Sequence, residues 1–70
     1  MKNIVITIDE KFIGDILSIS DKLQKDGLII TNTYEFGVII GSIDNDLIVK
    51  KLKAHKEVLS ITDERINHII

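Results

Sequence analysis

The chain of 70 residues contains no cysteine, so neither a disulfide bond nor a thiolate metal site can stabilise it. Aromatic residues make up only 4% of the chain, and its apolar fraction of 44% is mostly aliphatic. No apolar run approaches the ~18 residues of a transmembrane helix. No long run of charges of one sign is present either, and the net charge is −2 at pH 7. The composition therefore predicts a single domain with an aliphatic core, and weighs against a nucleic-acid or membrane partner.

Hydrophobic periodicity predicts six elements in the order β-α-β-β-α-β. The predicted strands are residues 3–7, 28–33, 38–42 and 58–62, and the predicted helices are residues 11–25 and 45–54. Two right-handed β-α-β crossovers interlock as a four-stranded antiparallel sheet with both helices on one face. We therefore expect an α+β, ferredoxin-like βαββαβ domain over residues 1–62, followed by an extended C-terminal tail over residues 63–70.

Local signals place the ends of these elements. Asp9 and Asp44 lie where helix N-caps are expected, and Gly27 lies where the first helix should stop. Gly37 predicts a turn or bulge between the second and third strands. The apolar residues expected to face the core are Phe12, Ile13, Ile16, Leu17, Ile19 and Leu23 in the first helix and Leu47, Ile48 and Leu52 in the second.

The second face of the sheet is predicted to be partly apolar. Three strands contain consecutive apolar residues, namely Ile4–Ile6, Leu28–Ile30 and Val38–Ile40. Because successive side chains of a strand point to opposite faces, each run places apolar groups away from the helices as well as toward them. These groups are either scattered surface aliphatics, which are normal, or a contiguous patch that a partner or a second copy covers.

The sequence offers no set of residues that is typical of a catalytic or metal site. His55 and His68 have no metal ligands at a convincing spacing, so a surface or capping role is expected. The DND segment at residues 44–46 lacks the glycine and the final glutamate of a calcium loop. The predicted strands also lack the aromatic residues of an RNA-binding sheet. We therefore expect a protein-binding module that is not an enzyme and has no cofactor and no metal.

One segment resembles a known family. It is Asp44–Thr62, with the sequence DNDLIVKKLKAHKEVLSIT, which has an Asp-capped start, a lysine-rich helix and then a strand of the type V-x-x-V. Val58 and Ile61 occupy the two apolar positions of that strand. With the predicted order of elements, this segment is similar to the propeptide domain of subtilisin-family serine proteases, a family that includes free-standing inhibitors. Acidic residues and a histidine follow the strand in the family, and here these are Asp63, Glu64 and His68.

The resemblance implies an inhibitor or folding chaperone of a subtilisin-like serine protease. It implies that the helix-free face of the sheet packs on two parallel surface helices of the protease. Thr62 and Glu64 would cap the N-termini of those helices, where free N–H groups and the helix dipole favour anions. A carboxylate is more usual than a hydroxyl at the position of Thr62. The tail residues implied to lie extended in the active-site cleft are Asn67, His68, Ile69 and Ile70.

Two other interpretations remain open from the sequence. A homodimeric ferredoxin-like regulatory or ligand-sensing module would use the same apolar face against itself. An accessory or immunity-type protein would bind an unrelated partner, and the tail would then be a frayed terminus with no role. The N-terminus, MKNIVITIDEKF, does not resemble a signal peptide, so we expect a cytoplasmic protein, or an extracellular one if the chain is an excised propeptide.

Overall fold

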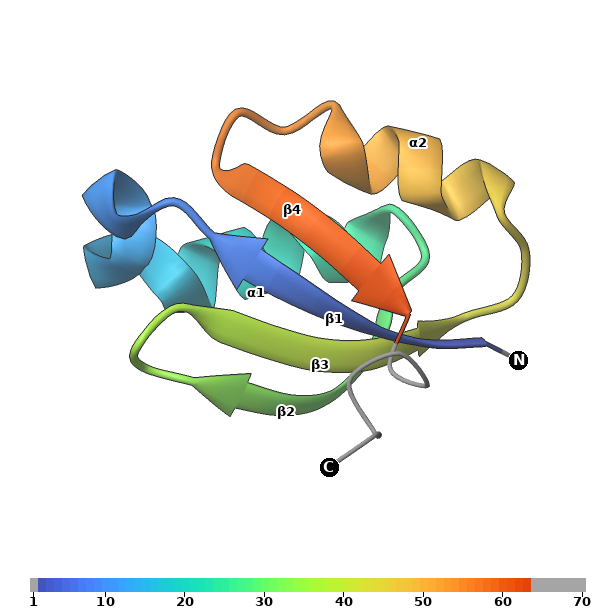
Figure 1. Cartoon of the computed structure of the whole chain (residues 1–70), viewed down its shortest axis with the longest axis horizontal. Coiled ribbons are helices and arrows are strands. Elements are labelled where there is room, and N and C mark those ends of the chain that lie inside the picture. The colour runs from blue at the N-terminus through green and yellow to red at the C-terminus, as the bar shows by residue number, and fades with distance from the viewer. Residues whose placement is uncertain (1, 64–70) are drawn as a thin grey trace.

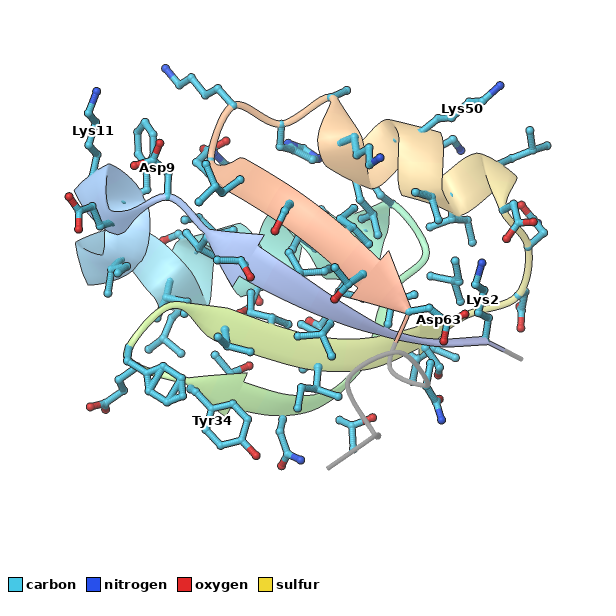
Figure 2. All side chains as sticks on the ribbon, viewed as in Figure 1. Lys2, Asp9, Lys11, Tyr34, Lys50 and Asp63 are labelled. Atoms are coloured by element: carbon cyan, nitrogen blue, oxygen red, sulfur yellow. The ribbon has the colours of Figure 1, made fainter. Side chains whose placement is uncertain are left out.

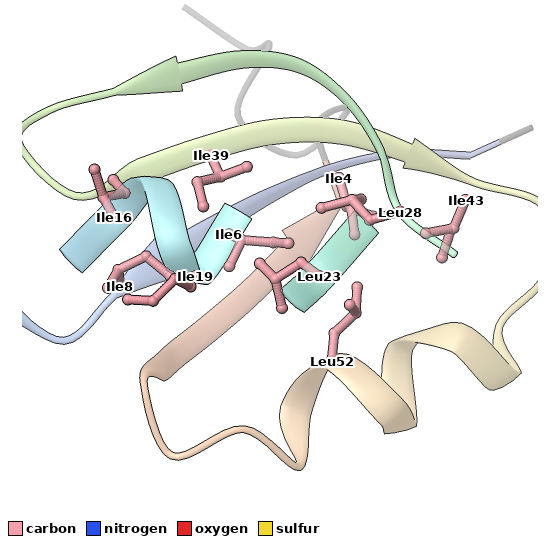
Figure 3. Close-up of a cluster of buried hydrophobic side chains, with 10 residues drawn as sticks. All are labelled: Ile4, Ile6, Ile8, Ile16, Ile19, Leu23, Leu28, Ile39, Ile43 and Leu52. Atoms are coloured by element: carbon pink, nitrogen blue, oxygen red, sulfur yellow. The ribbon is translucent and has the colours of Figure 1, made fainter. Parts of the chain in front are cut away.

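The computed structural model describes residues 2–63. Its elements are β1 (Lys2–Ile8), the 3-10 helix η1 (Glu10–Asp15), α1 (Ile16–Lys25), β2 (Ile29–Tyr34), β3 (Val38–Ile43), α2 (Leu47–Lys53) and β4 (Val58–Asp63). The strands form one antiparallel sheet in the order β2-β3-β1-β4, and both helices cover the same face of it (Figures 1 and 3). This confirms the predicted α+β, ferredoxin-like arrangement.

β1 is the central strand from which the core is built. Ile4, Ile6 and Ile8 occupy every second position of this strand, and each of them is at most 2% exposed. Because the strand has a period of two, these three side chains all point to the helix-covered face. There they form one cluster with the other buried apolar side chains of the domain, as Figure 3 shows. The remaining core residues are Ile16, Ile19, Leu23, Leu28, Ile39, Ile43 and Leu52.

Each helix buries a narrower apolar stripe than the sequence predicts. In α1 the stripe of Ile16, Ile19 and Leu23 is buried as expected, whereas Leu17 is 76% exposed. In α2 only Leu52 is fully buried, and Leu47 is 67% exposed. The predictions that Leu17 and Leu47 face the core are therefore wrong.

The predicted first helix begins as a 3-10 helix. Asp9 caps η1 as predicted, because its Oδ1 accepts a hydrogen bond of 3.0 Å from the backbone N–H of Lys11. The α-helical geometry starts only after Asp15, whose φ of −107° and ψ of 22° interrupt the helix. Gly14 precedes it, and glycine costs a helix about 1 kcal/mol relative to alanine. At the start of α2 the predicted cap Asp44 is wrong, since the N-cap position is occupied by Asp46, and the N–H of Leu47 donates to Asn45 Oδ1.

Two glycines are required by the hairpin of β2 and β3. Gly37 has a φ of 109° and donates its N–H to the carbonyl of Tyr34, which closes the turn between the strands. Gly41 lies within β3, where an added Cβ would stand 2.6 Å from the carbonyl oxygen of Ile29 on β2. Gly41 therefore allows the two backbones to approach beside the irregularity in β2.

The ends of the fold are joined by ion pairs at the surface. Lys2 Nζ lies 3.4 Å from Asp46 Oδ1 and 4.0 Å from Asp63 Oδ2, and Figure 2 shows Lys2 and Asp63 near each other. Exposed pairs of this kind contribute about 0–1 kcal/mol each, so the apolar core decides the stability. None of the helices within residues 2–63 is long and apolar enough to cross a membrane.

We expect Leu52→Ala to lower the free energy of unfolding by about 2–5 kcal/mol, because it leaves a cavity in the core. Leu47→Ala is the matched control, since Leu47 lies on the same helix but is largely exposed. Its effect should stay within about 0.5 kcal/mol. Urea unfolding followed by circular dichroism measures both variants. Equal losses in the two variants would contradict the proposed packing of α2.

Candidate functional site: the outer face of the sheet

The helix-free face of the sheet, here called the outer face, is determined by the strand register. Since Ile4, Ile6 and Ile8 point to the helices, their neighbours on β1 point away from them. Residues paired directly across strands share a face, which extends the same assignment to the other three strands. The residues of the outer face are Asn3, Val5, Thr7, Ile29, Asn32, Tyr34, Val38, Ile40, Ser42, Ser60 and Thr62.

A contiguous apolar patch crosses three strands of this face. Val5 on β1 pairs with Ile40 on β3, and Val38, two residues before Ile40, pairs with Tyr34 on β2. The ring of Phe36, which is 69% exposed, stacks on the ring of Tyr34 with their centroids 5.4 Å apart. Figure 2 shows Tyr34 at the margin of the sheet. We call these five residues the apolar patch.

None of the outer-face residues within 2–63 carries a charge. Around the apolar patch the face presents hydroxyl and amide groups, such as those of Thr7 and Asn32. Such groups can donate and accept hydrogen bonds without the cost of removing an ionised group from water. An apolar centre with a polar, uncharged margin is the anatomy of a protein-binding surface, in which charged residues are depleted from the core.

Of the site residues that the sequence predicts, the structure places one. Thr62 lies on β4, pairs with Val5 and so belongs to the outer face, as the resemblance requires. β4 continues to Asp63, one residue past the expected domain boundary. The other predicted site residues, which are Glu64, Asn67, His68, Ile69 and Ile70, lie outside the described residues.

Tyr34 and Phe36 are functional candidates that sequence reasoning missed. Both were expected only as part of a turn, and the structure instead stacks their rings beside the sheet. A signal was present, because two aromatic residues spaced by two before the turn glycine point to the same side of an extended chain. Only the pairing of Tyr34 with Val38 shows that this side is the outer face.

A separate polar cluster lies between the two helices. His55 Nε2 lies 2.5 Å from Asp26 Oδ2, which joins the loop after α2 to the C-terminal end of α1. Lys22 Nζ donates a hydrogen bond of 3.0 Å to Glu57, a residue that is only 8% exposed. That hydrogen bond is the main reason why the pKa of Glu57 lies below its ordinary value, while burial acts in the opposite direction. The cluster thus fastens α1 to the loop before β4, and His55, for which a surface or capping role is expected, contributes its contact with Asp26.

Within residues 2–63, no group of three or more histidine, cysteine, aspartate or glutamate side chains is placed so as to hold a metal ion. Comparison of the chain with models of protein families, with curated proteins and with solved structures finds no match.

We expect Glu57→Gln to reduce the acid sensitivity of the fold. Because the folded-state pKa of Glu57 is lowered from 4.5, its carboxylate stabilises the fold above that pH, and this contribution is lost as the pH falls through the lowered value. The stability of the natural chain should therefore fall more steeply than that of E57Q between about pH 5 and about pH 3.

Glu10→Gln is the control, since Glu10 is exposed and makes no ion pair with another described residue. Urea unfolding at several pH values measures the slopes. Identical slopes for the natural chain and E57Q would show that the contact with Lys22 does not stabilise the carboxylate.

Proposed function

We propose that this chain is a non-enzymatic module that binds another protein through the outer face of its sheet. The observation that carries the proposal is the absence of charge among the described residues of that face, with the apolar patch at their centre. Exposed positions of a sheet that faces only water are usually occupied by polar and charged residues. The outer face instead offers apolar side chains and uncharged hydrogen-bonding groups, which suit an interface from which a partner protein excludes water.

We further propose that the partner is a subtilisin-like serine protease, which the chain inhibits or helps to fold. The support is the resemblance of Asp44–Thr62 to the protease propeptides together with the βαββαβ fold. In such a complex the apolar patch would pack on surface helices of the protease, and the hydroxyl of Thr62 would face the same partner. The tail after β4 would extend into the active-site cleft and add a strand there.

We expect the chain to inhibit subtilisin with a dissociation constant of about 1 µM or lower, equivalent to about −8 kcal/mol. Ile40→Glu should weaken inhibition at least tenfold, or about 1.4 kcal/mol, because it places a charge in the apolar patch. Leu47→Glu is the matched control, because Leu47 lies on the helix side and is already exposed. Circular dichroism verifies that both variants fold, and equal inhibition by both would remove the outer face from the mechanism.

We expect deletion of residues 67–70 to abolish most of the inhibition while leaving the fold unchanged. These residues are proposed to occupy the cleft, and they follow β4, the last element of the fold, in the chain. An active-site titration of subtilisin with the intact and the shortened chain measures the difference. Full inhibition by the shortened chain would reject occupation of the cleft, although binding through the outer face could persist.

A homodimer is the second candidate, and the same uncharged face favours it. A two-fold axis brings each patch against its own copy, which would be costly if the patch carried charges of one sign. Light scattering separates the two functions. A stable dimer that Ile40→Glu dissociates, and that leaves subtilisin active, would favour the homodimer over the protease inhibitor.

A further inference from the structure

β2 forms one edge of the sheet. Among the described residues its only strand neighbour is β3, so the backbone N–H and C=O groups of alternate β2 residues point away from the sheet. Natural edge strands are commonly blocked by lysine, proline or a bulge. β2 has the sequence IITNTY, with no charge and no proline, and its irregularity lies between Ile30 and Asn32. Its last residues therefore remain a regular edge to which another strand can pair.

A groove runs beside this regular part of the edge, on the helix side of the sheet. Its volume is about 450 Å³, and it lies between β2 on one side and the last turn of η1 and the first turn of α1 on the other. Leu17, which is 76% exposed, and Ile13 give it an apolar wall. A Cβ added at Gly14 would stand in open space, which agrees with an open groove at this position. The residues that line the groove are Ile13, Gly14, Ile16, Leu17, Thr33 and Glu35.

The charge at the groove has one sign. Among residues 2–63, Glu35 is the only charged residue that lines it, and Asp15 lies in the chain between the lining residues Gly14 and Ile16. Both carboxylates are exposed, and neither makes an ion pair with another residue of the part of the chain that the structure describes. A basic side chain is the complementary group for this position.

We propose that the free edge of β2 and the adjoining groove bind an extended segment of a partner protein that carries apolar and basic side chains on one face. The segment pairs with β2 through main-chain hydrogen bonds. Because side chains of a strand alternate, every second one enters the groove, where an apolar group covers Leu17 and Ile13 and a basic group meets Glu35. This surface lies apart from Val5 and Ile40 at the centre of the apolar patch, so it can be tested independently of the protease.

The test is a nuclear magnetic resonance titration of the isotope-labelled full chain with a blocked hexapeptide. The three threonines of this peptide alternate with a valine, a lysine and a second valine, in that order. The two valines and the lysine therefore share one face of the extended peptide. We expect shifts of the Thr33 amide and of the methyl groups of Ile13 and Leu17, with no change at Val5 or Ile40. A second peptide with proline in place of the central threonine lacks a backbone donor and should bind much more weakly.

Variants of the chain test the two side-chain contacts. Leu17→Asp should abolish the shifts, whereas Leu47→Asp, at a similarly exposed leucine on α2, should leave them unchanged. Glu35→Lys should weaken the lysine peptide about threefold, as for an exposed ion pair, and strengthen a peptide with glutamate in place of the lysine. The amide spectrum of each variant verifies its fold.

Several outcomes would overturn the proposal. These are an absence of shifts at millimolar peptide, shifts confined to Val5 and Ile40, or equal binding of the lysine and glutamate peptides. Shifts of the Thr33 amide that follow the concentration of the chain alone would instead assign the β2 edge to a second copy.

Discussion

The alternation of isoleucines along β1 is the constraint on which the rest of the structure depends. Ile4, Ile6 and Ile8 are buried against both helices, and a one-residue slip of the strand would expose all three. β1 lies between β3 and β4, so its register fixes the register of both neighbours. Burial of one face of the sheet thereby determines which side chains the other face presents. The apolar patch is a consequence of how the core is packed.

The helices are held to this sheet by apolar burial and by two polar contacts at the same end. Lys22 and Asp26, one helical turn apart on α1, contact Glu57 and His55 of the segment that leads into β4. A domain of this size buries a smaller share of its surface than a larger domain does, and it contains no disulfide to assist it. These contacts therefore restrain the loop between α2 and β4 where apolar packing is thin. They lie on the helix side of the sheet, and the outer-face residues that the structure describes carry no ionised group.

β2 is shared by the two surfaces that we assign to binding. Tyr34 faces the apolar patch, whereas Thr33, its neighbour in the strand, faces the groove beside α1. Strand periodicity thus separates two chemically different surfaces on one short hairpin: an uncharged one on the sheet and an acidic, apolar one at its edge. A partner that covers the outer face does not need to occupy the groove, and the reverse also holds.

Local patterns were sufficient for most of the fold. Periodicity and turn residues predicted each strand to within about two residues, and Asp9 and Gly37 behave as their chemistry requires. The interruption at Asp15 and the exposure of Leu17 were not predicted, because the apolar spacing of residues 11–25 is the same for a continuous helix with a wider buried stripe.

The sequence by itself determined that both faces of the sheet contain apolar residues, because runs such as Val38–Ile40 cannot point to one side. It also determined the order of elements and hence the ferredoxin-like topology. Only the tertiary structure decided which members of each run face outward, that they join Tyr34 and Phe36 in one patch, and that a groove opens beside β2. The physical reason is that alternation is local to a strand, whereas adjacency is created by pairing between residues far apart in the chain.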